Sequence, residues 1–200
     1  MKIYVPFKPA NPKSRLSDVM SERERGEFAF ALLMDVLDAC EDAVVLSSSH
    51  ERRLEGLKHE IDERDLDAAV TSRIKKGECA VVMSDLPLIT RKTVNEFLSR
   101  DGDVVLAPGR KGGTNMLLSR NRLFYTSYHY GSFFKHLKIC DELGILCEIF
   151  DSFRASIDID DESDLLELML HGKGKRSYEY LESIGFYVDY NEKDPALRRE

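Results

Sequence analysis

Short apolar runs rich in β-branched residues alternate with amphipathic segments along this chain, and that alternation limits the folds open to it. The runs lie at residues 3–7, 43–47, 79–83, 103–107 and 145–150. Continuous apolar runs of this length are typical of strands covered on both faces, whereas the segments between them have the apolar spacing of helices. Strands alternating with helices predict a single α/β domain over residues 1–200, with a largely parallel sheet.

Capping signals mark the expected helices. Ser21 and Glu24 have the spacing of a capping box, and apolar residues recur every four positions from there to Cys40. Thr90 is expected to cap a second helix that ends at Leu98. Further helices are expected at residues 66–74, 132–143, 161–170 and 178–184, and extended segments at residues 115–119, 154–159 and 186–190.

Composition excludes several classes of protein. The chain has 200 residues, 42% of them hydrophobic and 32% charged, which is ordinary for a soluble globular domain. A net charge of -7 argues against nucleic acid as a partner. The four cysteines lack metal-like spacing and favour a reduced, cytoplasmic setting. With no bilayer-length apolar stretch and no signal-like beginning, we expect no membrane association.

An acidic residue follows the apolar run at residues 79–83, in the sequence Ser84–Asp85, and Pro87 prevents the strand from continuing. In an α/β domain this position lies at the carboxyl edge of the sheet, where loops gather ligands. Oxygen ligands suit a hard cation such as Mg²⁺, which usually arrives with substrate phosphates. A solvated acid or a helix cap in an ordinary turn fits Asp85 equally well.

A second acidic position lies at Asp158 and Asp160, which alternate with Ile157 and Ile159. In a strand this alternation places both carboxylates on one face. A divalent cation would relieve the repulsion between them. Capping of the following helix by Asp160 or Asp161 is the competing interpretation.

Three basic or glycine-containing loops complete the candidate site. Lys8, Lys13 and Arg15 crowd a loop stiffened by prolines, and such a loop can either clamp a triphosphate or remain a solvated surface loop. Residues 108–115 combine Arg110 and Lys111 with a Gly-Gly pair, which fits an anion site or a simple turn. Gly131 and Ser132, at the head of a helix, offer free amides to a phosphate or only a helix cap.

Taken together, these segments resemble a known family. Residues 5–16 resemble its opening strand and Lys-rich loop, and residues 21–37 resemble its next helix. Its later signatures are matched, in order, by residues 84–88, 112–115 and 157–160. The family is the 2-phospho-L-lactate guanylyltransferases of deazaflavin coenzyme F(420) biosynthesis, and the similarity extends to about Leu166.

The resemblance implies a three-layer α/β/α fold with a mostly parallel mixed sheet, like that of nucleotide-diphospho-sugar transferases and type-A glycosyltransferases. That superfamily usually has a Gly-rich loop after its first strand; here Pro and Lys replace it, as in the guanylyltransferase family. The resemblance also implies GTP as donor, a phosphorylated three-carbon acid as acceptor, and Mg²⁺ as cofactor.

The roles implied for individual residues follow the matched motifs. Catalytic roles fall to Asp85, Lys13 and Arg15, and the metal ligands would be Asp85, Asp158 and Asp160. Nucleotide binding is expected from Lys8, Lys13, Ser14, Arg15, Ser84 and Asp85, and acceptor binding from Thr114, Gly131 and Ser132.

Two other functions remain open. One is a nucleotidyltransferase that acts on a sugar phosphate or another cofactor precursor, and the other is a noncatalytic nucleotide-binding module on the same fold. Phe186, Tyr187 and Tyr190 are apolar residues in an otherwise polar tail. They can dock on the domain or on a second subunit, and we expect a homodimer.

Overall fold

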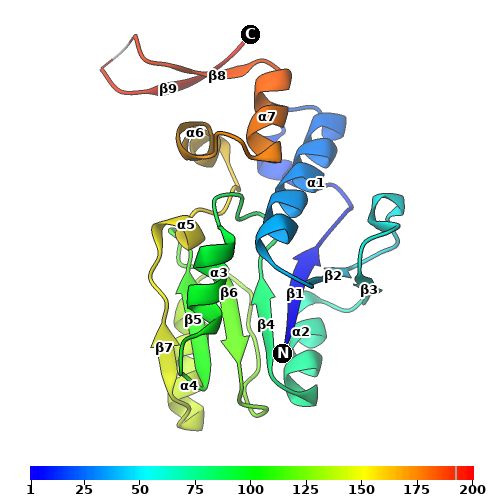
Figure 1. Cartoon of the computed structure of the whole chain (residues 1–200), viewed down its shortest axis with the longest axis vertical. Coiled ribbons are helices and arrows are strands. Elements are labelled where there is room, and N and C mark those ends of the chain that lie inside the picture. The colour runs from blue at the N-terminus through cyan, green and yellow to red at the C-terminus, as the bar shows by residue number, and fades with distance from the viewer. Residues whose placement is uncertain (192) are drawn as a thin grey trace.

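The computed structural model describes residues 1–191 and 193–200, and its centre is a seven-stranded mixed sheet flanked by helices (Figure 1). The strands are β1 (Lys2–Phe7), β2 (Val44–Ser47), β3 (His59–Ile61), β4 (Cys79–Val82), β5 (Val104–Pro108), β6 (Thr114–Ser119) and β7 (Cys147–Ile149). Their spatial order is β3-β2-β1-β4-β6-β5-β7. Strand β6 runs antiparallel to β4 and β5, and the other neighbours are parallel. The predicted α/β class with a mostly parallel mixed sheet is confirmed.

Helices cover both faces of this sheet, as the three-layer prediction requires. On one face lie α1 (Glu22–Ala39), α3 (Arg91–Leu98) and the short α5 (Phe153–Ser156); on the other lie α2 (Leu66–Lys76) and α4 (Ser132–Leu143). Successive strand residues point to opposite faces. Accordingly, Ile3 and Val5 pack in the α1/α3 cluster, and Tyr4 packs against α2.

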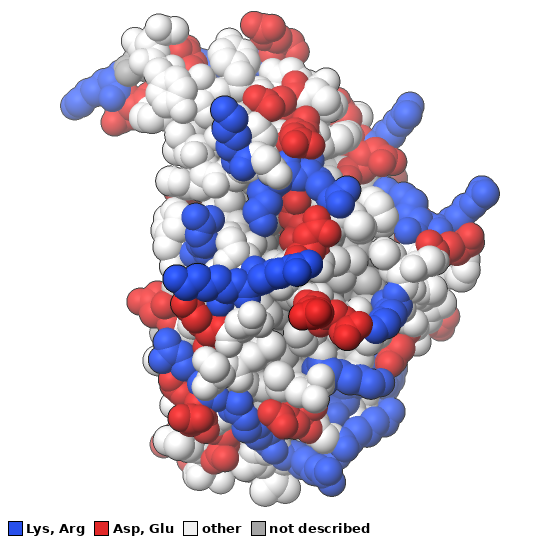
Figure 2. Space-filling view, in the orientation of Figure 1, with Lys and Arg blue, Asp and Glu red and all other residues white. Residues whose placement is uncertain are grey.

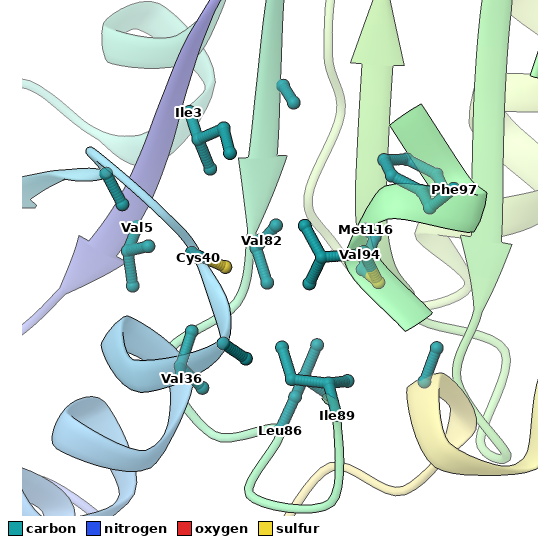
Figure 3. Packing of buried hydrophobic residues seen from close by; sticks show 14 of the residues in the cluster. Ile3, Val5, Val36, Cys40, Val82, Leu86, Ile89, Val94, Phe97 and Met116 are labelled. Carbon is teal, nitrogen blue, oxygen red and sulfur yellow. The ribbon is translucent and has the colours of Figure 1, made fainter. Parts of the chain in front are cut away.

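The α1/α3 face shows why the strand runs are apolar without interruption. Figure 3 shows Val5 of β1 and Val82 of β4 in one cluster with Val36 of α1. Met116 of β6 and Phe97 of α3 belong to the same cluster. Val5, Val82, Val36 and Phe97 are fully buried. Since the opposite face is covered in the same way, neither face of the central strands tolerates polar side chains.

A third apolar cluster lies beyond the carboxyl ends of the strands. It joins α1 to α6 (Glu162–His171), α7 (Arg176–Ser183) and the hairpin β8 (Phe186–Asp189) and β9 (Ala196–Arg199), which sits at the top of Figure 1. The carboxylate of Asp35, on α1, accepts hydrogen bonds from the backbone N–H groups of Arg176 (2.8 Å) and Ser177 (3.0 Å). These bonds satisfy the first turn of α7 and hold that helix against α1.

The predicted helix boundaries are largely confirmed. Ser21 and Glu24 form both halves of a capping box, and Thr90 caps α3. Gly144, at φ 63°, ends α4 in the left-handed conformation that favours glycine. Of the helices in the described part of the chain, none has both the length and the apolar composition that a bilayer span requires.

The predicted extended segment at residues 154–159 is wrong. Its first part is helix α5, and Ile157 and Ile159 lie in irregular backbone. The backbone of this segment makes isolated hydrogen bonds instead of a ladder: Ile159 N–H donates to the Asp85 carbonyl (3.0 Å), and Arg110 N–H to the Ser156 carbonyl (3.1 Å). Without a neighbouring strand, alternation of apolar and polar residues does not produce a strand.

Two strands were not anticipated. Strand β3 lies in the highly charged stretch after β2, and β9 lies near the end of the chain. Strand β3 is an edge strand of the seven-stranded sheet, and β9 belongs to a two-stranded sheet. In such strands, exposed polar residues hide the alternation of apolar and polar side chains.

Candidate active site

A cleft of about 690 Å³ opens at the carboxyl ends of β1, β2, β3 and β4. Three loops contribute much of its lining: residues 8–15 after β1, residues 62–65 after β3, and residues 83–85 after β4. Its lining includes the predicted nucleotide-site residues Lys8, Lys13, Ser14, Arg15, Ser84 and Asp85, together with the predicted metal ligand Asp160. The carboxyl edge of an α/β sheet is the expected place for a ligand site.

The basic loop after β1 has an unusual backbone. Asn11 (φ 43°) and Lys13 (φ 52°) both have positive φ, a conformation that costs energy for a residue with a Cβ atom. Arg25 of α1 is 8% exposed and holds the loop in place. Its guanidinium donates to the Asn11 side-chain oxygen (3.0 Å) and to the carbonyls of Met20 (3.0 Å) and Pro12 (3.4 Å).

The loop places Lys13 between two of the predicted acids. Its Nζ lies 2.6 Å from Oδ2 of Asp85 and 3.4 Å from Oδ1 of Asp160, and the guanidinium of Arg15 lies 3.3 Å from Oδ2 of Asp160. Burial alone would lower the pKa of Lys13, but the charges of Asp85 and Asp160 outweigh burial and raise its pKa above the ordinary value. Lys13 is therefore a fixed positive charge in the cleft.

Asp158 shares this electrostatic environment. Burial is the main cause that raises the pKa of its carboxyl, and the negative charges of Asp85 and Asp160 add to the effect. Its Oδ1 accepts a hydrogen bond from Nδ2 of Asn115 (3.1 Å), which also donates to the Ala155 carbonyl (2.9 Å). Among the residues described, Asp85 and Asp160 line the cleft and Asp158 does not, although its carboxyl lies near enough to both for their charges to act on it.

The competing interpretation of the second acidic position applies to the neighbouring residue. Asp161 is the N-cap of α6, and its Oδ1 accepts from Ser163 N–H (3.1 Å). The carboxylate of Asp160 remains available for Lys13 and Arg15. Apolar packing holds this segment in place, because Ile157 and Ile159 lie in the third apolar cluster together with Leu16. The acidic segment and the end of the basic loop are therefore anchored to the same cluster.

The donor set fits a hard cation that arrives with its substrate. Among residues 1–191 and 193–200, no three His, Cys, Asp or Glu side chains are grouped closely enough to form a metal site by themselves. Mg²⁺ is usually held by one or two carboxylates together with waters and substrate phosphates. The raised pKa of Asp158 shows that added positive charge would be favourable there.

The predicted acceptor residues lie apart from this cleft. Within the described chain, its lining does not include Thr114, Gly131 or Ser132. Thr114 and Ser132 are 3% and 4% exposed, and the Thr114 N–H donates to Oγ of Ser132 (2.9 Å). Gly131, at φ 67°, begins α4 in the left-handed conformation. The hydroxyls of Thr114 and Ser132 are therefore hydrogen-bonded in the protein interior.

His136 is part of the same buried group and was not singled out by its sequence context. Its Nε2 accepts a hydrogen bond from the Ser127 N–H (2.8 Å), so Nδ1 carries the proton and donates to Oγ1 of Thr114 (2.8 Å). Burial lowers the pKa of His136 to about 4. The ring is neutral at pH 7 and ties α4 to the first residue of β6 and to the loop that follows β6.

Arg110 and Lys111 contribute less free positive charge than the sequence suggested. Arg110 pairs with Glu167 (2.7 Å) and Asp164 (3.1 Å), and Lys111 pairs with Asp161 (2.7 Å) and Asp164 (2.8 Å). Asp164, which is 1% exposed, also accepts a hydrogen bond from the Asp160 N–H (2.9 Å). One buried carboxylate therefore links the Gly-containing loop to the backbone of Asp160.

Three supporting residues were given no role by the sequence, although Asn115 lies in the matched segment 112–115. Arg25, Asn115 and Asp164 act through partners up to 54 positions away. Arg25 occupies a buried position in a helix rich in exposed charges, so its pattern resembles that of its neighbours. Across the face drawn in Figure 2, basic and acidic side chains are interspersed, and charge alone does not mark the site.

The architecture matches solved nucleotide-handling proteins. A putative nucleotide-diphospho-sugar transferase from Desulfovibrio desulfuricans G20 superposes with a TM-score of 0.71 at 15% identity, covering 92% of this chain and 95% of that one. A CMP:2-keto-3-deoxy-manno-octonic acid synthetase complexed with CTP gives 0.54 at 12% identity, covering 90% and 98%. The fold is therefore that of the nucleotide-diphospho-sugar transferases.

Sequence similarity identifies the family to which the chain belongs. Residues 1–200 match the family described as "Guanylyl transferase CofC like". The chain is 76% identical to the 2-phospho-L-lactate guanylyltransferase of Ferroglobus placidus over 199 residues, which span 100% of both chains. It is 53% identical to the protein of that name from Archaeoglobus fulgidus, over 100% of this chain and 97% of the other. The chain belongs to the CofC-like guanylyl transferase family.

Proposed function

We propose that this enzyme transfers GMP from GTP to 2-phospho-L-lactate, or a closely related phosphorylated three-carbon acid, in coenzyme F(420) biosynthesis. The observation that carries the proposal is the full-length identity of 76% to the Ferroglobus placidus protein of that name. The products are lactyl-2-diphospho-5'-guanosine and pyrophosphate.

In the proposed reaction, a phosphate oxygen of the acceptor attacks the α-phosphorus of GTP. The bond from that phosphorus to the oxygen bridging the β-phosphate breaks, and pyrophosphate leaves with the bridging oxygen. The acceptor phosphate is already anionic near neutral pH, so no strong general base is needed. Catalysis then consists mainly of positioning and charge neutralisation.

The basic loop is suited to the donor side of this reaction. Lys13 is pinned between Asp85 and Asp160, so its charge is already oriented before the nucleotide binds. Lys8, Lys13 and Arg15 line the cleft and would bind the triphosphate and stabilise the departing pyrophosphate. Ser14 and Ser84 add hydroxyl groups to the same lining.

We propose that Asp85, Asp158 and Asp160 hold Mg²⁺ together with the substrate phosphates. When bound, Mg²⁺ would supply charge neutralisation of the phosphates. The protein's part is to keep Asp85 and Asp160 in the cleft and Asp158 close to them, with Asn115 orienting Asp158 and Asp164 fixing the backbone of Asp160. Asp85 also accepts a hydrogen bond from Lys13 Nζ (2.6 Å), which holds its carboxylate at the cleft.

The acceptor side is assigned to Thr114, Gly131 and Ser132. Because the two hydroxyls are already hydrogen-bonded inside the protein, these residues would act by shaping the loop at residues 109–115. Free backbone amides of that glycine-containing loop would then contact the acceptor's phosphate or carboxylate.

Identification of the product by mass spectrometry tests the proposal. GTP, Mg²⁺ and 2-phospholactate should give lactyl-2-diphospho-5'-guanosine and one pyrophosphate per turnover, and activity should disappear on adding a chelator. Phosphoenolpyruvate, and ATP, CTP and UTP, serve as comparison substrates. Turnover of a sugar phosphate in place of the acids would favour another nucleotidyltransferase, and GTP binding without turnover of any acceptor would favour a noncatalytic module.

Variants test the metal assignment. Asp85→Asn and Asp158→Asn should each strongly reduce pyrophosphate release, and Asp18→Asn, an exposed acid near the basic loop, should not. If both cleft variants kept wild-type pyrophosphate release, the metal assignment would be wrong.

We also propose that the protein is a cytoplasmic homodimer. The four cysteines are free thiols, as a reduced compartment requires. Phe186 is 3% exposed and docks on its own domain, whereas Tyr187 and Tyr190 are 42% and 68% exposed and could serve a subunit contact. Light scattering after gel filtration should give a mass near twice 22.9 kDa. A monomer mass at micromolar concentration would contradict the proposal.

A further inference from the structure

The cleft extends well beyond the basic loop, toward the β2–β3 side of the sheet. There it is lined by Ser48, by the loop of residues 62–66, and by the apolar side chains of Leu46, Leu66 and Ala69. Leu46 and Ala69 belong to the apolar cluster under α2, so they form a firm floor. A nucleotide whose triphosphate lies at Lys13 and Arg15 has this part of the cleft left for its base.

Three carboxylates lie in the loop at this end, and two of them are already engaged. Asp62 accepts from Arg64 Nε (2.8 Å) and from the guanidinium of Arg73 (2.6 Å), and these bonds hold the pKa of Asp62 well below its usual range. Asp65 is the N-cap of α2 and accepts from the Ala68 N–H (2.7 Å). Both carboxylates are therefore already committed to holding the loop and the start of α2 in place.

Glu63 differs from both neighbours. It lies between them and lines the cleft, and within the described chain its carboxylate takes part in no hydrogen bond or ion pair. The residues around it are fixed, because Arg64 bonds to both Asp62 and the Ser72 hydroxyl (2.9 Å). A free acceptor is therefore presented by an anchored loop at the base end of the cleft.

The chemistry of an unpaired carboxylate selects among bases. Guanine carries two adjacent donors on its Watson–Crick edge, N1–H and the exocyclic N2 amino group, and an ionised carboxylate is acceptor-only and can take both. Adenine has an acceptor at N1, which a carboxylate repels. We propose that the Glu63 carboxylate is the group that reads guanine, an inference that rests on the proposed function.

Nucleotide binding by calorimetry, with wild type and Glu63→Gln, tests this assignment. Gln keeps the shape of Glu but offers a single carbonyl acceptor and an amide that opposes the guanine donors. We expect GTP affinity to fall about tenfold to a hundredfold, with ATP affinity within about twofold of wild type. Inosine triphosphate lacks the N2 amino group, so the wild-type preference for GTP over it should largely disappear in the variant.

Glu55→Gln is the matched control, since Glu55 is exposed, lies in the same stretch of chain and does not line the cleft among the residues described. Glu63→Ala repeats the test without an opposing amide, and the melting temperature of each variant confirms folding. Equal losses for GTP and ATP, or a GTP preference that survives in both Glu63 variants, would overturn the assignment.

The outcomes separate this inference from the function on which it rests. Formation of the guanylylated product by wild type, combined with an unchanged base preference in the Glu63 variants, overturns only the role of Glu63. A wild-type protein that binds GTP no better than ATP overturns both.

Discussion

The ammonium group of Lys13 lies 2.6 Å from Oδ2 of Asp85, although 72 positions separate the two residues in the chain. Lys13 is held in a left-handed backbone conformation, and Asp85 lies in the loop that follows the buried strand β4. Their side chains are 12% and 17% exposed, so the pair is shielded from water on most sides. The fold thus fixes a positive charge in the cleft.

Loss of that charge should impair catalysis more than folding. For Lys13→Met, we expect kcat/KM for pyrophosphate release to fall by about 10²–10³, the usual effect of removing one oriented electrostatic group. Lys2→Met removes a largely exposed lysine at the far end of β1 and should leave activity unchanged. Activity of Lys13→Met within threefold of wild type would contradict this role.

Arg25 should control the basic loop from outside the cleft. Arg25→Gln removes its bonds to Asn11, Pro12 and Met20 and leaves buried carbonyls without donors. We expect a loss of about 2 kcal/mol in the free energy of unfolding and a KM for GTP raised about tenfold.

Arg25→Lys should recover little of the lost stability or of the wild-type KM for GTP, because an ammonium cannot reproduce the planar fork of a guanidinium. Steady-state kinetics and urea unfolding check both quantities, with Arg23→Gln on the exposed face of the same helix as control. If the KM for GTP stayed at the wild-type value while stability fell, Arg25 would serve the fold alone.

Asp164 should contribute both to the stability of the fold and to the positioning of Asp160. Asp164→Asn removes the buried charge that Arg110 and Lys111 share and weakens the bond from the Asp160 N–H. Since both cations are partly exposed, we expect about 2 kcal/mol of destabilisation rather than the larger cost of a fully buried pair.

The same variant should raise the Mg²⁺ concentration needed for half-maximal activity, as measured by titration. Glu167→Gln breaks a single bond to Arg110. It should therefore change neither the stability nor the Mg²⁺ requirement to a comparable degree. An unchanged Mg²⁺ requirement in Asp164→Asn would separate Asp164 from the site.

His136 should make stability depend on pH. Its folded pKa of about 4 lies below the unfolded value of 6.5, because burial disfavours the charged ring. The stability due to the neutral ring is therefore fully present above pH 6.5 and is lost as the pH falls toward 4. The total loss is about 3 kcal/mol, since each unit of pKa shift corresponds to about 1.4 kcal/mol.

The measurement is the difference in unfolding free energy between wild type and His136→Gln at a series of pH values from 7 to 4. The gap between the two proteins should narrow as the pH falls. A constant gap across that range would show that His136 does not titrate on unfolding.

Much of the fold could be predicted from local sequence. The apolar runs became β1, β2, β4 and β5 because a strand buried on both faces tolerates few polar residues over its whole length. Helix starts at Ser21 and Thr90 were readable because a capping side chain bonds within its own first turn. The segment 154–159 was misread, since forming a strand depends on a neighbour that the alternation of residues does not reveal.

The chain by itself therefore determined most of the segments that form strands and helices, and that acids and cations follow the ends of particular strands. Only the tertiary structure decided how those charges are paired. It placed Lys13 near Asp160, 147 positions away, and committed Arg110 and Lys111 to Asp164. It also engaged Asp62 and Asp65 while leaving Glu63 without a partner among residues 1–191 and 193–200. The reason is physical: capping and periodicity act within a few residues, whereas an ion pair depends on distances that exist only once the elements have packed.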